Sequence, residues 1–179
     1  IVEDTMAIFH TKLKMNEGKV HFNLGEGLPP IWGYPLKLEQ VLGNLLVNAS
    51  NAIVGKTNGR ISITTRYIKG LHAVLMEVED NGNGMTKDQM ERIFDPFFTT
   101  RRQDGGTGLG LSISHGIVKE HHGFIGVLSR PELGSRFSVF LPVEKGGQLA
   151  VQPNLLIIDD DPSVLKMLKS NFIKLDKRF

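Results

Sequence analysis

Cysteine is missing from all 179 residues of this sequence. Disulfide bonds and thiolate metal sites are therefore excluded, which fits a reducing compartment. The formal net charge of +2 is too small to indicate a nucleic-acid partner or an anionic membrane surface. No apolar run approaches the roughly 20 residues that span a bilayer, and no signal peptide is visible. We therefore expect a cytoplasmic domain. Because the sequence does not begin with Met, we expect a piece of a longer protein that could be membrane-anchored elsewhere.

The residues that are present have an ordinary globular composition, with 40% hydrophobic and 22% charged residues. Hydrophobic periodicity predicts helices at about 3–15, 36–53, 87–94, 109–121 and 162–172, and strands at about 20–24, 60–67, 72–80, 124–129, 136–141 and 155–158. This order is neither a run of βαβ units nor all-β. It predicts an α/β (α+β) fold, a two-layer sandwich with a mixed sheet and helices on one face.

A polar row lies beside the apolar stripe of the long second helix. Gln40, Asn44 and Asn48 are spaced by four, so they share one edge of the helix. Asparagine is unfavourable inside helices, and two amide oxygens one turn apart could ligate a hard cation such as Mg²⁺. Taken alone, a solvated helix face is the better interpretation of this row.

A carboxylate ends the second strand of the central pair. Asp80 continues the alternating series of Val74, Met76 and Val78, so it points toward the apolar face. A buried carboxylate needs donors, and the exocyclic amine of adenine would supply one. Gly82 and Gly84 would let a planar ring approach the backbone. An ordinary Asp-Asn-Gly turn explains the same residues equally well.

Two loop segments complete the polar constellation. Residues 94–102 place three phenylalanines around a proline, followed by two threonines and two arginines. Residues 105–111 are rich in glycine and run directly into a helix, where free N–H groups and the helix dipole favour phosphate. They match neither the Walker spacing nor the dinucleotide spacing. A surface loop pinned by aromatics and a merely flexible glycine loop remain the alternatives.

In this order, the four clusters resemble the ATP-binding domain of sensor histidine kinases, which share a superfamily with gyrase and the mismatch-repair ATPases. Residues 38–49 resemble its N box, and residues 80–84 its first glycine box. Residues 94–100 resemble its F box, and residues 106–111 its second glycine box. Residues 134–137 with Leu141-Pro142 resemble the closing strand. The resemblance covers about residues 1–143 and implies the Bergerat fold of that superfamily.

The resemblance also implies Mg²⁺ and ATP as cofactors. By motif, Asn48 would ligate Mg²⁺ through ATP with support from Asn44, and Asp80 would accept a hydrogen bond from the adenine amine. The glycines Gly82 and Gly84 would shape the adenine pocket. The ATP-binding set implied in this way is Asn44, Asn48, Asp80, Gly82, Gly84, Phe97, Thr99, Thr100, Arg101, Gly106, Thr107, Gly108, Leu109, Gly110 and Ser135.

Residues from about 95 to 107 would form a mobile lid over the phosphates, with Phe97 and Phe98 as its few apolar anchors. Gly106, Gly108 and Gly110 would supply its hinge and phosphate contacts. Two positions depart from the family pattern. Tyr34 stands where many relatives have Asp, and Arg101 stands where many have Lys, although Arg keeps the charge.

The C-terminal segment resembles the start of a response-regulator receiver domain. A buried strand, residues 155–158, precedes an acidic pair, Asp159 and Asp160, that helps hold Mg²⁺ in that family. An acidic helix start favoured by the helix dipole is the alternative. We therefore expect a histidine kinase catalytic domain at 1–145, a linker at 146–153 and a truncated receiver at 154–179.

The implied function is transfer of the ATP γ-phosphoryl group to a histidine in a hybrid kinase. None of the six histidines lies in the phosphoacceptor motif, so that residue is expected on a dimerisation domain before Ile1. The piece alone should then show little chemistry. Its expected partners are that dimerisation domain and a receiver domain, and a homodimer is open. The alternatives are an ATP hydrolase, which needs a Glu where Asn44 stands, and a non-catalytic nucleotide-binding adaptor.

Overall fold

The computed structural model describes residues 20–101 and 106–143, together with the backbone of residues 156–157. Its elements in chain order are β1 (Val20–Leu24), α2 (Pro35–Ala52), β2 (Ile61–Ile68), the 3₁₀ turn η1 (Lys69–Leu71), β3 (Ala73–Asp80), α3 (Lys87–Arg92), α4 (Gly110–Glu120), β4 (Phe124–Arg130), β5 (Gly134–Pro142) and β6 (Leu156–Ile157). The expected helices at 3–15 and 162–172, the linker and the acidic pair Asp159–Asp160 lie outside the described residues.

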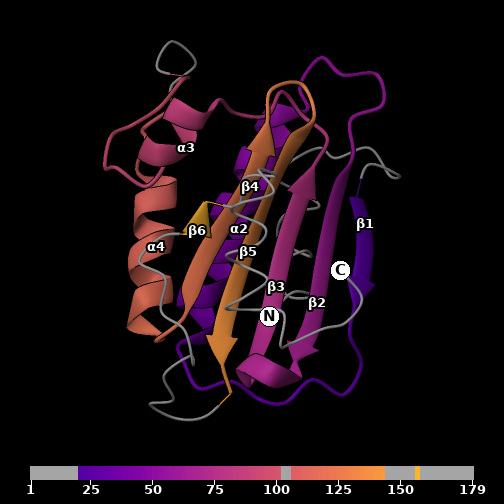
Figure 1. Ribbon diagram of the computed structural model, residues 1–179, viewed down its shortest axis with the longest axis vertical. Helices are drawn as coiled ribbons and strands as arrows, with labels where there is room; N and C mark the ends of the chain where they lie inside the picture. The colour runs from indigo at the N-terminus through magenta and orange to yellow at the C-terminus, as the bar shows by residue number, and fades with distance from the viewer. Residues whose placement is uncertain (1–19, 102–105, 144–155, 158–179) are drawn as a thin grey trace.

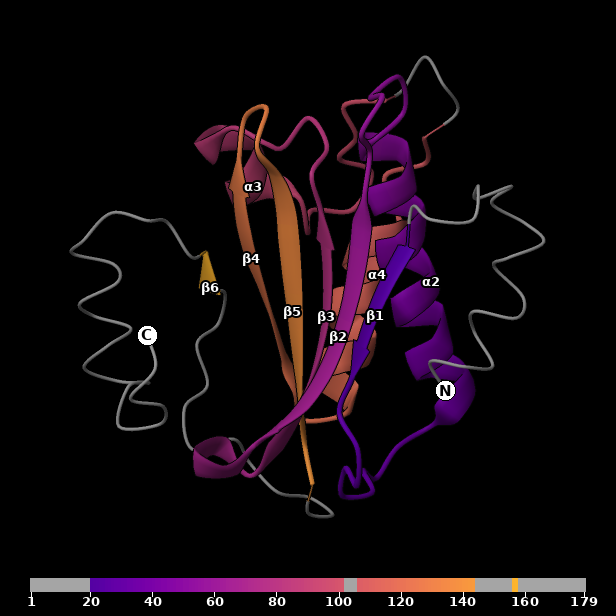
Figure 2. The ribbon, with the colours of Figure 1, turned by 90° about the vertical axis from the view of Figure 1, so that its right-hand side faces the viewer.

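The strands form one mixed sheet in the order β1-β2-β3-β5-β4-β6. The pairs β2–β3, β3–β5 and β4–β5 are antiparallel, whereas β1 pairs with β2 and β6 with β4 in parallel. Figure 1 shows α2 and α4 side by side behind the sheet, and Figure 2 shows that both cover the same face. The two-layer sandwich expected from the sequence is confirmed.

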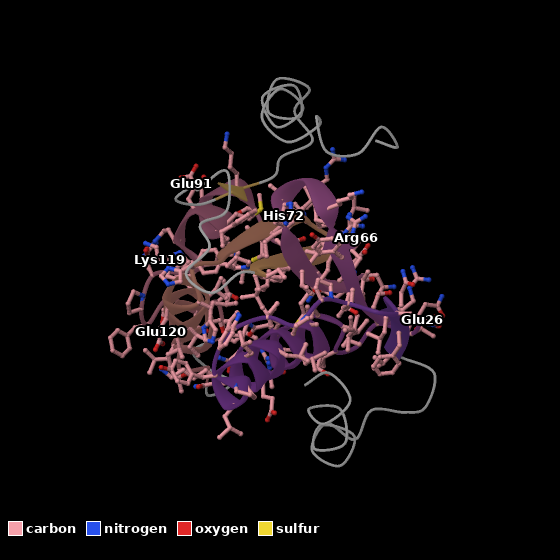
Figure 3. All side chains as sticks on the ribbon, turned by 90° about the horizontal axis from the view of Figure 1, so that it is seen from below. Glu26, Arg66, His72, Glu91, Lys119 and Glu120 are labelled. Carbon is pink, nitrogen blue, oxygen red and sulfur yellow. The ribbon has the colours of Figure 1, made fainter. Side chains whose placement is uncertain are left out.

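Helix α2 supplies more of the buried core side chains than any other described element. Its buried residues recur every three or four positions, so that one stripe faces the sheet. Leu42, Leu45 and Leu46 are fully buried and pack in the same cluster as Ile63, Val78 and other sheet residues. Figure 3, seen from below, shows side chains filling the space between the sheet and the helices, with Lys119 and Glu120 at the end of α4. This packing fixes how α2 lies on the sheet.

The start of α2 is tied to the end of α4. Pro35 occupies the first helical turn, where its missing N–H costs nothing. Tyr34 caps the helix without a side-chain bond, and its backbone N–H donates to Nε2 of buried His121 over 2.9 Å. The Tyr34 ring meets the His121 ring edge-on and lies under Nζ of Lys37. These contacts show what holds Tyr34 in place at the start of α2.

Two expectations about the first strand and third helix need correction. Strand β1 forms as predicted, but the alternation of Val20, Phe22 and Leu24, which is typical of a half-buried strand, does not give it a buried face. Phe22 is 49% exposed and Leu24 is 37% exposed, and β1 lies at an edge of the sheet. Helix α3 ends at Arg92 rather than at residue 94. None of the described helices is both long and apolar enough to cross a membrane.

Candidate functional site

Asp80 ends β3 on the face that packs against the helices. It follows Met76 and Val78 on that face and is only 5% exposed. Its Oδ1 accepts the backbone N–H of Gly82 over 2.8 Å, and the backbone of Ser135, its partner across β5, also bonds to it. Burial nevertheless raises the pKa of Asp80 to about 6, since desolvation outweighs these bonds. A buried carboxylate with acceptor capacity to spare is therefore present where the sequence predicted it.

The glycines after Asp80 are required by the protein's own packing. A Cβ on Gly82 would lie 2.5 Å from the Cβ of Ala52 at the end of α2. Gly84 has a φ of +63°, and a Cβ there would collide with the carbonyl oxygen of Arg130. Both contacts are closer than real Cβ atoms tolerate. The sequence predicted that these glycines shape an adenine pocket. In the structure they are also needed for the packing of the loop against its neighbours.

The loop that carries these glycines is fixed by hydrogen bonds on both sides. Asn81 accepts from the backbone N–H of Arg60 and donates to the carbonyl of Asn58. The backbone N–H of Asn83 donates to the carbonyl of Ala52 over 3.1 Å, and Nζ of Lys56 donates to the carbonyl of Gly82 over 2.8 Å. Hydrogen bonds thus hold the first glycine box rigidly between the end of α2 and the sheet.

Serines on β4 and β5 complete this end of the sheet. Ser129 Oγ donates to the carbonyl of Gly134 over 2.8 Å and accepts from the backbone N–H of Met85 over 2.9 Å. Ser135 Oγ lies 2.9 Å from Ser129 Oγ, and both serines are buried. Ser135, predicted as a ligand contact, therefore lies beside Asp80 and has its hydroxyl bonded to Ser129.

The two asparagines of α2 have different environments. Asn44 Nδ2 donates to the carbonyl of Gly110 over 2.9 Å and to Ser114 Oγ over 3.1 Å, so this amide joins α2 to α4. Asn48, one turn later and half-buried, makes no hydrogen bond through its side chain within the described residues. Its amide oxygen is therefore available to a ligand or a cation.

Helix α4 begins in the second glycine box without a side-chain cap. Its cap is Leu109, and its first turn contains no acidic residue. The N–H groups of that turn are therefore open to an anion, as at other helix starts that bind phosphate. Gly108 has a φ of +68°, and a Cβ there would lie 2.5 Å from the carbonyl carbon of Phe97. The backbone N–H of Phe97 in turn donates to the Gly108 carbonyl over 2.9 Å.

The F-box loop packs against this second glycine box. Thr99 Oγ1 accepts from the backbone N–H of Arg101, and a Cβ on Gly106 would lie 2.8 Å from the same oxygen. Thr107 Oγ1 accepts weakly from the backbone N–H of Leu109, and Thr100 is exposed. Residues 102–105 of the expected lid lie outside the described residues. The described parts of the F box and the glycine box are therefore joined directly.

The aromatic anchors of this loop differ from the expectation. Phe97 is 66% exposed, with a φ of +65°, so it does not anchor the loop. Phe98 is half-buried against the core with Arg92 over its ring, and Phe94 packs on His115. An open hollow of about 440 Å³ is lined by Arg92 and residues 95–99, but it includes neither Asp80 nor Asn48. We therefore place the candidate site at the polar groups and not at this hollow.

No group of three or more His, Cys, Asp or Glu side chains that could hold a metal occurs in the part of the chain that the structure describes. The amide oxygen of Asn48 is nevertheless the kind of hard ligand that Mg²⁺ accepts. One such ligand fits an ion that is bound mainly by phosphate oxygens and water.

Residues 33–145 match the family of histidine kinase-, DNA gyrase B- and HSP90-like ATPases. The chain belongs to this family. It is 34% identical over 148 residues to sporulation kinase E of Bacillus subtilis, across 83% of this chain and 19% of that protein. Over 143 residues it is 37% identical to the sensor histidine kinase ZraS of Escherichia coli, across 80% of this chain and 30% of that protein. The chain thus spans less than a third of these curated relatives.

The catalytic domain of the histidine kinase ThkA has a similar structure, with a TM-score of 0.63 and 31% identity. That match covers 79% of this chain and 89% of the ThkA chain. Together with the kinases above, it identifies the chain as the ATP-binding catalytic domain of a histidine kinase.

Several residues of this histidine kinase domain escaped prediction. Ser114 lies four residues after Gly110 and meets Asn44, a signal that helical spacing could have given. No local sequence pattern could have identified Ser129, Lys56 and His121, because each forms its hydrogen bond with a residue far away in the sequence.

Proposed function

We propose that this domain binds Mg-ATP and donates the γ-phosphoryl group to a histidine on a dimerisation domain of the same protein. The P–O bond to ADP would break as a P–N bond to the imidazole forms, and the imidazole proton would be released. Phosphoryl transfer needs chiefly positioning and charge neutralisation, so the domain would act by holding the nucleotide and its cation.

The observation that carries this proposal is the buried carboxylate of Asp80. It is buried, it accepts hydrogen bonds from backbone N–H groups, and its burial opposes its charge. A donor such as the adenine amine, placed against it, would relieve part of that penalty. We assign adenine recognition to Asp80, beside Ser135 and the rigid loop of Gly82 and Gly84.

The remaining roles follow from what each group can offer a nucleotide. Asn48 would ligate the Mg²⁺ that ATP brings, since its amide oxygen is uncommitted within the described residues. The open N–H groups at the start of α4, reached through Gly106, Thr107, Gly108, Leu109 and Gly110, would bind phosphate oxygens. Phe97, Thr99, Thr100 and Arg101 would belong to the covering loop, where the arginine would neutralise phosphate charge.

The presence of asparagine at position 44 favours kinase activity over hydrolase activity. Activation of water needs a general base, and an amide is no base at neutral pH. The Asn44 amide is, moreover, engaged as a donor to Gly110 and Ser114. A carboxylate in its place would set a negative charge against two oxygens that now accept a hydrogen bond from Asn44.

A receiver domain beginning near residue 154 remains part of the proposal. It rests on the sequence of the apolar run 155–158 and the acidic pair Asp159–Asp160. Phosphoryl transfer from the histidine to such a receiver would make the whole protein a hybrid kinase, with the receiver as its second partner.

Autophosphorylation of the full-length protein with radiolabelled ATP tests this function. We expect acid-labile label on a histidine, and none in Asn48→Ala, whose helix should survive because Ala is the better helix former. The matched control is Asn51→Ala on the same helix, which should keep its label. Steady release of phosphate without labelled protein would indicate the hydrolase, and ATP binding with neither product would indicate the adaptor.

A further inference from the structure

Lys56 lies in the turn that follows α2, and its side chain reaches the first glycine box. Backbone bonds close this turn, since the N–H of Lys56 donates to Ile53 and its carbonyl accepts from Gly59. Nζ of Lys56 donates to the carbonyl of Gly82 over 2.8 Å and to that of Glu132 over 3.4 Å. The Glu132 carboxylate is 3.7 Å away and exposed, so this ion pair adds little. The carbonyl of Gly82 is therefore the closest partner of a partly buried ammonium group.

The peptide group between Gly82 and Asn83 is held at both ends. Its carbonyl accepts from Lys56, and its N–H donates to the carbonyl of Ala52 over 3.1 Å. The N–H of Gly82, in the preceding peptide group, donates to Oδ1 of Asp80 over 2.8 Å. Glycine has the freest backbone of all residues, so these partners fix the conformation of Gly82. Holding its carbonyl thus also keeps its N–H on Asp80.

The charge of Lys56 acts on Asp80 in the same direction. Burial, the largest influence, raises the pKa of Asp80, and the like charge of Glu79 on the same strand raises it further. Backbone bonds from Gly82 and Ser135 lower that pKa, and so does the positive charge of Lys56. Lys56 therefore favours the charged carboxylate twice, through the bond that it holds in place and through its own charge.

We propose that Lys56 is a positioning residue for adenine recognition: by holding the carbonyl of Gly82, it keeps Asp80 in the charged form that accepts the adenine amine. This inference rests on the proposed adenine role of Asp80. A charged carboxylate only accepts hydrogen bonds, so it favours the amine at C6 of adenine over the carbonyl at C6 of hypoxanthine. Lys56 would thus contribute to a preference for ATP over ITP while acting through Gly82 and Asp80.

The affinity of the full chain for Mg-ATP, measured by calorimetry between pH 5 and 8, tests this role. Lys56→Met keeps most of the length of the side chain and removes its charge and its donor. We expect this variant to bind ATP about three- to tenfold more weakly at pH 7, the effect of about one hydrogen bond. The pH below which ATP affinity falls should also move upward, because the protonated form of Asp80 is then favoured.

Two further variants serve as controls. Lys56→Arg keeps a positive charge and N–H donors, so it should retain both the ATP affinity and its pH profile. Lys69→Met removes an exposed lysine at the opposite end of β3 and should change neither. Because Lys56 is partly exposed, we expect Lys56→Met to fold.

The double variant Asp80→Asn with Lys56→Met separates a positioning role from a merely structural one. We expect Lys56→Met to weaken ATP binding in the parent chain but not in the Asp80→Asn background, where the carboxylate is already gone. In the single variant Lys56→Met the preference for ATP over ITP should narrow. Equal weakening in both backgrounds, or an unmoved pH profile in Lys56→Met, would overturn the proposal and leave the adenine role standing. Unchanged ATP affinity in Asp80→Asn alone would overturn both.

Discussion

At the scale of single residues, Asp80 shows that a candidate binding group can oppose the folding of its own domain. The folded state raises the pKa of this carboxyl from 3.8 to about 6. The folded state therefore binds a proton more tightly than the unfolded chain, and the free energy of unfolding falls as the pH rises from about 4 to 6.

Replacing Asp80 by Asn removes this penalty and the carboxylate acceptor together. At pH 7 we expect Asp80→Asn to gain up to about 1–3 kcal/mol in free energy of unfolding and to bind ATP at least tenfold more weakly. In the parent chain, ATP affinity should fall below pH 6, as the acceptor is protonated. Urea unfolding and calorimetry at pH 5 and 7.5 measure both effects. Unchanged affinity in a folded variant would rule out the adenine role.

His122 offers a prediction about backbone conformation. It follows α4 with a φ of +55°, a left-handed conformation that glycine usually adopts after the end of a helix. We expect His122→Gly to raise the urea midpoint, corresponding to about 0.5–1 kcal/mol. His122→Ala keeps the strained backbone and should bring no gain. A gain of the same size in both variants would show that the imidazole, and not the backbone, is the cause.

At the scale of elements, the contact between α2 and α4 joins two parts of the candidate site. Asn44→Ala would remove two hydrogen bonds while improving helix propensity, so we expect a net loss of about 1 kcal/mol and weaker Mg-ATP binding. Asn44→Asp keeps the shape of the side chain but places a negative charge against the two acceptor oxygens. We therefore expect it to lower stability and Mg-ATP affinity more than Asn44→Ala does. Denaturant melts and ATP titrations compare them, and an Asp variant that equals the parent would contradict the bridging role.

The elements themselves could largely be predicted from local pattern, whereas their contacts could not. The stripe of α2 and the alternation of β3 placed Asp80, Asn44 and Asn48 on the correct faces. The same alternation misled at β1, because the exposure of Phe22 depends on which strands and helices lie next to it. The His121 contact with Tyr34 joins positions far apart in sequence, and no local spacing marks it.

At the scale of the whole molecule, ligand binding should stabilise the domain as a unit, because the candidate site draws on α2, β3, the F-box loop and α4. At a hundredfold excess over Kd, Mg-ATP should add about 2.7 kcal/mol, or about 5–10 °C in Tm for a domain of this size. Thermal melts with ATP, with ATP and EDTA, and with Asp80→Asn measure the shift. An equal rise in Tm for Asp80→Asn would indicate that ATP binds at another site.

The interlocked glycines have a consequence for how sequence variation in this domain is interpreted. Gly82, Gly84 and Gly134 each leave no room for a Cβ beside another part of the backbone. A survey of substitutions scored by kinase signalling would therefore mark them as strongly as Asp80, although their loss acts on folding. We expect substitutions at these glycines to reduce the amount of folded protein. We expect a substitution at Asp80 to leave the amount of protein unchanged and to abolish its signalling. Measuring abundance beside signalling sorts the two classes without any nucleotide being added.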